Sequence, residues 1–224
     1  LNLFGFDVNF GSVGYLLAVI AIIWILNLFN FMDGIDGIAG VEAISVTFFA
    51  GLFLSIISPN SPLVLLHWLL AASVCGFLVL NFPPARIFMG DAGSGFLGFM
   101  LASLALTSAQ VDQNMLWVWL TLLGVFIVDA TFTVIHRFIR GEKVHEAHRS
   151  HAYQYASRKH NSHLKVTLAV LAINCFWLAP MAYLIVNNTF NGFLVLLIAY
   201  LPLIIIAFKY KAGAAESVDQ SLHK

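Results

Sequence analysis

The chain has 224 residues, of which 60% are hydrophobic and 10% are charged, and its 11 basic and 11 acidic residues leave no net charge. A soluble domain carries about 25% charged residues. The composition therefore excludes a soluble globular protein and indicates an all-α polytopic membrane protein, and no nucleic-acid partner is expected. Cys75 and Cys175 fall in apolar stretches, so we expect no disulfide framework. Because the sequence starts at Leu1 without a basic and apolar leader, we expect an N-terminally truncated chain.

Charge-free stretches of the sequence predict seven membrane-spanning helices, since a span needs about 20 apolar residues. The longest two stretches lie between Glu42 and Arg86 and between Lys165 and Lys209, and polar turns at 58–62 and 187–191 divide each into two. The apolar runs are continuous rather than alternating, which favours helices over a β-barrel. The predicted spans are about 12–31, 41–57, 63–80, 95–109, 115–135, 166–186 and 192–208.

The basic residues predict the orientation of these spans. If the loops alternate between the two sides of a membrane, all 11 Lys and Arg residues fall on the same side. The positive-inside rule makes that side cytoplasmic. We therefore expect one multi-pass domain over residues 1–208 and a cytoplasmic tail over 209–224, in a bacterial inner (plasma) membrane.

The first polar segment on that side, residues 27–37, reads Asn-Leu-Phe-Asn-Phe-Met-Asp-Gly-Ile-Asp-Gly. Two turns would explain the Asp-Gly pairs at Asp33 and Asp36. They would not explain Asn27 and Asn30, which lie on one helix face at a spacing of three. The segment therefore favours a metal or nucleotide site over a pair of turns.

The second polar segment, residues 81–95, places Asp91 among small residues just before the fourth predicted span. Such a carboxylate suits Mg²⁺ shared with substrate phosphates, and it equally suits a helix cap. Residues 93–98 also match the glycine pattern of dinucleotide-binding proteins, but no βαβ unit surrounds them, so we reject that interpretation.

The third polar segment contains His145, His148, Arg149 and His151. The spacing does not match the zinc-protease pattern His-Glu-x-x-His. A His/Arg group of this kind binds phosphate or a metal, and the alternative is a solvated basic loop beside anionic lipid headgroups.

Two acidic residues lie within or beside predicted spans. Asp129 falls inside the fifth span, where an acid is either functional or a buried polar contact. We expect Glu42, at the start of the second span, to extend its side chain to the membrane interface.

The order Asn-x-x-Asn-x-x-Asp-Gly-x-Asp-Gly, Phe-Met-Gly-Asp-x-Gly-Ser and His-x-x-His resembles the polyprenyl-phosphate N-acetylhexosamine-1-phosphate transferases. The stretch 148–154 is most similar to the branch that initiates O-antigen and lipopolysaccharide synthesis. The resemblance implies transfer of a sugar 1-phosphate from a UDP-N-acetyl sugar to undecaprenyl phosphate, with release of UMP, at the cytoplasmic membrane face. It leaves open which N-acetyl sugar is transferred.

The resemblance also implies a site. Asp91 and Asn30 would bind Mg²⁺, or Mn²⁺ in its place, and Phe88 would stack on uracil. The remaining residues that it implies are Asp33, Asp36, His148 and His151 as catalytic residues, and Asn27, Asn81 and Arg149 as substrate-binding residues.

One departure from the family pattern concerns an Asp-Asp pair that its members carry in an earlier loop. No Asp-Asp pair occurs in this sequence, and family members have ten or eleven spans rather than seven. We expect that the truncated chain alone is inactive, and that the whole protein forms a homodimer if it is an oligomer. The alternative function is a membrane transporter, with Asp129 as its intramembrane acid.

Overall fold

The computed structural model describes residues 2–3, 6–7, 11–142 and 149–214, and most of them are helical. Two two-residue strands, β1 (Asn2–Leu3) and β2 (Phe6–Asp7), pair antiparallel before the first helix. The helices are α1 (Gly11–Met32), α2 (Ile38–Ile57), α3 (Pro62–Asn81), α4 (Gly90–Val111), α5 (Asn114–Leu122), α6 (Gly124–Ile139), α7 (Ala152–His160), α8 (His163–Ile173), the π-helical segment η1 (Asn174–Leu178), α9 (Ala179–Val186) and α10 (Gly192–Lys209).

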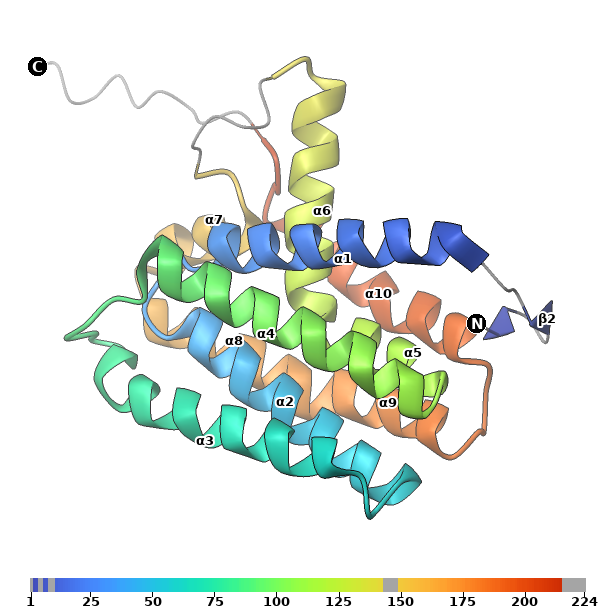
Figure 1. Ribbon diagram of the computed structural model, residues 1–224. Coiled ribbons are helices and arrows are strands. Elements are labelled where there is room, and N and C mark those ends of the chain that lie inside the picture. Colours follow the sequence, from blue (N-terminus) through green and yellow to red (C-terminus); the bar gives the residue numbers. More distant parts are fainter. Residues whose placement is uncertain (1, 4–5, 8–10, 143–148, 215–224) are drawn as a thin grey trace, which may run out of the picture.

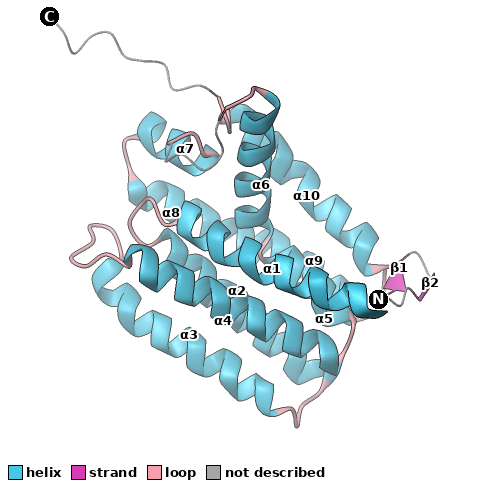
Figure 2. Ribbon diagram, turned by 45° about the horizontal axis from the view of Figure 1, so that its top comes forward, coloured by secondary structure: helices cyan, strands magenta, loops and turns pink. Residues whose placement is uncertain are grey.

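Six helical segments of the described chain are long and apolar enough to cross a membrane, or seven if α5 and α6 together form one span. The predicted all-α polytopic fold is therefore confirmed. The helices α1, α4, α2 and α3 run side by side (Figures 1 and 2), with the closest packing between α1 and α4 and between α2 and α3. Gly98 permits the first of these contacts, because a Cβ there would lie 2.8 Å from the carbonyl oxygen of Ile25.

The region of the predicted fifth span, about 115–135, is broken into two helices. α5 and α6 meet at a bend of 71° around Leu123, and α6 stands across the other helices in Figure 1. The hydroxyl of Tyr200 on α10 donates to the carbonyl of Leu120 at 2.7 Å. A neighbouring helix thus satisfies a backbone group at the break, which is how broken helices are tolerated in membrane proteins.

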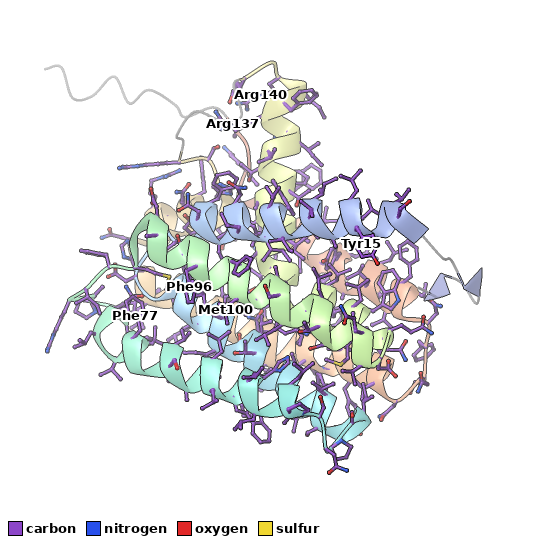
Figure 3. All side chains as sticks on the ribbon, in the orientation of Figure 1. Tyr15, Phe77, Phe96, Met100, Arg137 and Arg140 are labelled. Carbon is purple, nitrogen blue, oxygen red and sulfur yellow. The ribbon has the colours of Figure 1, made fainter. Side chains whose placement is uncertain are left out.

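Large apolar side chains cover the outer surface of the bundle, as expected for contact with lipid. Tyr15 on α1 is 80% exposed and Phe96 on α4 is 63% exposed, and both point outward in Figure 3. The same view shows Arg137 and Arg140 at the projecting end of α6. Both arginines pair with Glu142, Arg137 Nε at 2.8 Å from its carboxylate.

The expectation that Glu42 reaches the membrane interface was wrong, since the residue is fully buried. Asn174, the first residue of η1, donates through Nδ2 to the Glu42 carboxyl at 2.6 Å and to Ser45 Oγ at 2.8 Å. Glu42 lies on the face of α2 that packs against η1 and not on the lipid-facing side. It therefore joins two helices through a buried polar contact.

Asp129 is also a buried polar contact, which decides between the two alternatives for this residue. Its two carboxylate oxygens accept hydrogen bonds from the backbone N–H groups of Ala152 and Tyr153, both at 2.9 Å. Thr133 donates to the same carboxylate at 3.2 Å. These amides belong to the first turn of α7, where the helix dipole favours an anion. Asp129 therefore attaches α7 to the bundle.

Candidate active site

A cavity of about 310 Å³ lies at the end of the bundle where α1 ends and α2 begins. The connection between α3 and α4, on the left in Figure 1, and the first residue of α8 complete its wall. Six residues that the sequence singled out line this cavity, namely Asn30, Asp33, Asp36, Asn81, Phe88 and Asp91. Segments as far apart as residues 30 and 163 thus meet in one polar site.

Asn30 and Asp91 come from different helices and are connected through Ser94. The Ser94 hydroxyl, one turn into α4, donates to Asn30 Oδ1 at 3.1 Å and is also 3.3 Å from the carbonyl oxygen of Asp91. Ser94 is fully buried, whereas Asn30 and Asp91 are exposed. The arrangement fixes the Asn30 amide and leaves the Asp91 carboxylate open to the cavity.

Asp33 has the most perturbed acidity in this cavity. Its partial burial, and then the nearby negative charge of Asp91, raise the pKa of Asp33 to about 7. Two carboxylates that oppose each other's ionisation are a common feature of functional sites. A bound cation would relieve this repulsion.

Asp36 and Asn81 form the wall between the two connections of the site. Asp36 Oδ2 accepts from the backbone N–H of Ala85 at 3.1 Å. Asn81 accepts from Gly37 N at 3.1 Å and donates to the carbonyl of Ile87 at 2.9 Å. Both side chains therefore hold the α1–α2 turn against the α3–α4 connection, and they line the cavity while doing so.

His163 is a cavity residue that we did not single out from the sequence. Its Nδ1 lies 3.2 Å from Asp36 Oδ1 and 3.4 Å from the backbone nitrogen of Asp36. A protonated ring donates to the carboxylate, and a neutral ring accepts from the amide, so His163 can hold Asp36 in either state. The sequence signal was only its position three residues before the sixth predicted span.

Phe88 has an unusual position for a phenylalanine of this protein, because it lines the polar cavity and is still 78% exposed. An aromatic face held at the mouth of a polar cavity is suited to stacking against a planar ligand. Gly34 also lines the cavity, and a Cβ at this position would overlap the Tyr153 hydroxyl. That hydroxyl donates to the carbonyl of Phe31 at 2.9 Å, which joins α7 to the end of α1.

The other predicted site residues do not line this cavity. Asn27 donates to the carbonyl of Ile23 at 2.7 Å, one turn before the site. His151 is buried, with Nδ1 3.4 Å from Asp129 Oδ1 and its ring 6.2 Å from that of Phe31. Arg149 is exposed, and its carbonyl accepts from Arg158 at 2.9 Å. His148 lies outside the described residues.

The donors in the cavity fit Mg²⁺ better than a transition metal. No group of three His, Cys, Asp or Glu residues suited to a metal occurs in the described part of the chain. Mg²⁺ typically uses one or two carboxylates and takes its remaining ligands from water and substrate phosphates. Asp91 and the Asn30 amide supply hard oxygen donors of this kind, and the opposed carboxylates of Asp33 and Asp91 favour a cation.

The fold and the cavity together define a polytopic α-helical membrane protein with an acidic, oxygen-rich site at one end of the bundle. The model of glycosyl transferase family 4 matches residues 1–109, which contain all the cavity residues except His163. The N-terminal half of the chain is therefore similar to this family.

The chain is similar to several curated members of the family. A probable undecaprenyl-phosphate N-acetylglucosaminyl 1-phosphate transferase of Bacillus subtilis (strain 168) is 35% identical over 46% of this chain and 29% of its own length. A phospho-N-acetylmuramoyl-pentapeptide-transferase of Prochlorococcus marinus (strain NATL2A) is 32% identical over 65% of this chain and 39% of its own. A decaprenyl-phosphate N-acetylglucosaminephosphotransferase of Mycobacterium leprae (strain TN) is 29% identical over 54% and 33%. The matches thus span less than two fifths of these relatives.

Proposed function

We propose that the protein transfers an N-acetylhexosamine 1-phosphate from a UDP-sugar to undecaprenyl phosphate. The observation that carries this proposal is the cavity that gathers three carboxylates, two amides and an exposed phenylalanine from two separate segments, 30–36 and 81–91. The names of the Bacillus and Mycobacterium relatives, which describe transfer of N-acetylglucosamine phosphate to undecaprenyl phosphate and to decaprenyl phosphate, support it. The stretch 148–154 favours a role in starting O-antigen synthesis.

The reaction is a phosphoryl transfer with a lipid acceptor. A phosphate oxygen of undecaprenyl phosphate attacks the sugar-linked phosphorus of the UDP-sugar. The bond from that phosphorus to the bridging oxygen breaks, and UMP leaves with that oxygen. Such a reaction needs alignment of the reactants and neutralisation of charge more than covalent help from the protein.

We assign the metal position to Asp91 and Asn30. Bound there, Mg²⁺ would neutralise charge on the pyrophosphate and orient it. Ser94 holds the Asn30 oxygen toward this position. Asp33, whose pKa is raised by burial and by Asp91, stands close enough to interact with the same charges.

We assign the nucleotide position to the side of the cavity formed by Phe88, Asp36 and Asn81. Stacking of a base on an aromatic side chain is worth about 1–3 kcal/mol. Asp36 is held by Ala85 and His163, and Asn81 by Gly37 and Ile87, so neither side chain needs to rearrange to form the wall.

The acceptor substrate explains why such a site would lie at the end of a membrane bundle. A polyprenyl chain stays in the bilayer while its phosphate reaches the interface. The positive-inside rule favours the cytoplasmic face of the plasma membrane for this end of the bundle. The competing idea of a transporter rested on Asp129, whose carboxylate accepts hydrogen bonds from the first turn of α7.

The test is release of UMP by the protein expressed from its complete reading frame, with undecaprenyl phosphate and a panel of UDP-N-acetyl sugars. Asp91→Asn should lower the rate by about 10²–10³-fold, the usual cost of losing one electrostatic stabiliser. Asp112→Asn is the matched control, because Asp112 lies outside the cavity. Its Oδ1 accepts a hydrogen bond from the backbone N–H of Asn114 in the α4–α5 turn. Rates of Asp91→Asn near those of the unmodified protein would contradict the metal assignment, and no UMP release with any sugar would contradict the proposed reaction.

A further inference from the structure

A second cavity of about 280 Å³ lies between α6, α7, α8 and α10, and none of its lining residues belongs to the first cavity. Its wall is mainly apolar, with Val128, Ala156, Val170 and Leu203 facing the space from the four helices. Apolar cavities exclude water and accept apolar ligands. This volume is below the roughly 300–1,000 Å³ of pockets that enclose a drug-sized molecule. It therefore suits part of one hydrocarbon chain.

The cavity lies where a membrane lipid could enter it. Lys165 is in the first turn of α8 and Tyr210 directly follows α10, so the cavity lies at the end of two candidate spans. Ala169 and Ile206 line it and are also exposed, which leaves the outer side between α8 and α10 open. The exposed face of both helices is otherwise apolar, as for helices in contact with lipid.

Basic side chains lie at one end of this cavity. Lys165 and His160 line the cavity. Tyr210 also lines it, and Lys159 Nζ lies 5.6 Å from the centre of the Tyr210 ring. Lys211 Nζ lies 5.9 Å from the Tyr155 ring nearby. In the ion pairs of the described residues, the carboxylates have an arginine or a histidine as partner and not one of these lysines. The partners are Arg137, Arg140, His151 and His163.

The carboxylate that lines this cavity already has its own partners and does not neutralise the lysines. Asp129 lines the inner wall, but its oxygens accept from the amides of Ala152 and Tyr153 and from Thr133. An apolar cavity with a cationic rim is complementary to an anion that carries a hydrocarbon chain. Basic residues at the cytoplasmic membrane surface attract anionic lipids in the same way.

We propose that this cavity binds one acyl chain of an anionic phospholipid of the bilayer, with the lipid phosphate held by Lys165 and His160. A phospholipid fits better than the lipid substrate, because the phosphate of that substrate must enter the first cavity. Tyr153 lies in the wall between the two, since its ring lines the second cavity and its hydroxyl donates to Phe31 beside the first. This choice between the two lipids rests on the proposed transferase function, whereas the apolar cavity and its lysines do not.

The test is native mass spectrometry of the delipidated protein with phosphatidylglycerol or phosphatidylcholine of identical acyl chains. Phosphatidylglycerol should bind more tightly at one site. Lys165→Gln should weaken it by about fivefold, the effect of one basic residue at an anionic surface, and leave phosphatidylcholine unchanged. Lys209→Gln is the matched control, because Lys209 is exposed at the end of α10 and does not line the cavity. Equal losses in both lysine variants would overturn the proposal.

Two cavity-filling variants test the apolar part separately. Ala169→Phe and Ala156→Phe should lower the binding of both phospholipids at this site, with retained folding checked by thermal unfolding. Because Ala169 is exposed, its substitution should be tolerated even if that of buried Ala156 is not. Unchanged lipid binding in a folded Ala169→Phe variant would refute the cavity as the site. Displacement of phosphatidylglycerol by undecaprenyl phosphate, with the same sensitivity to Lys165→Gln, would identify the substrate lipid as the occupant and refute the phospholipid.

Discussion

Asp129→Asn should release the first turn of α7 from the bundle while leaving the membrane helices in place. The carboxylate of Asp129 accepts from two backbone amides at 2.9 Å, and the amide that replaces it has only one oxygen. One N–H of α7 would then face an NH₂ group. A hydrogen bond to a charged group contributes about 1.5–3 kcal/mol, and an anion at a partly buried helix N-terminus contributes up to about 2 kcal/mol. We therefore expect a local loss of about 2–4 kcal/mol.

Hydrogen–deuterium exchange measures this loss directly, because it reports the free energy of local opening. A loss of about 2–4 kcal/mol should speed exchange of the amides in residues 152–160 by roughly 30- to 1,000-fold. Asp112→Asn is the control, because Asp112 lies in the turn after the C-terminal end of α4 and its substitution should leave α7 unchanged. Exchange of the α7 amides at the rate of the unmodified protein in Asp129→Asn would refute the assignment of Asp129 as the attachment of this helix.

Three further predictions concern the site and the bundle. His163→Ala should weaken UDP-sugar binding several-fold in calorimetry, because Asp36 loses a partner 3.2 Å away, and an unchanged Kd would show that His163 is not needed. The pKa of Asp33 rises from 3.8 unfolded to about 7 folded, so the folded state binds more protons and this residue makes stability fall as pH rises through that range. Asp33→Asn should therefore raise Tm at pH 8 but not at pH 4, and an equal change at both would contradict the shift. Gly98→Ala should destabilise the protein by about 1–3 kcal/mol, since its Cβ would meet the α1 backbone at 2.8 Å. Gly76→Ala, which meets no atom within 4 Å, should be neutral or stabilising in the same denaturation assay.

The residues of the first cavity show how much of a site sequence motifs can predict. Asn30, Asp33, Asp36 and Asp91 stood out because polar residues beside long apolar stretches are costly unless they bind something. His163 did not stand out, because a histidine at the start of a span has many structural explanations. Its role depends on contact with Asp36, which is 127 residues earlier in the chain.

The two acidic residues near the spans show the limit of the same reasoning. Composition identified Glu42 and Asp129 as unusual, but it could not say which neighbour each one faces. Glu42 meets Asn174 at a π-helical segment, and Asp129 meets the first turn of α7. Neither partner has a sequence pattern that points back to the acid.

The sequence by itself determined the membrane class and the approximate spans. The physical reason is that lipid acts as a uniform solvent, so each span must be apolar and internally hydrogen-bonded regardless of its neighbours. Only the tertiary structure decided the bend between α5 and α6, the attachment of α7 and the two separate cavities. These features depend on contacts between helices distant in the chain, such as Tyr200 with Leu120, which a local pattern of hydrophobicity does not encode.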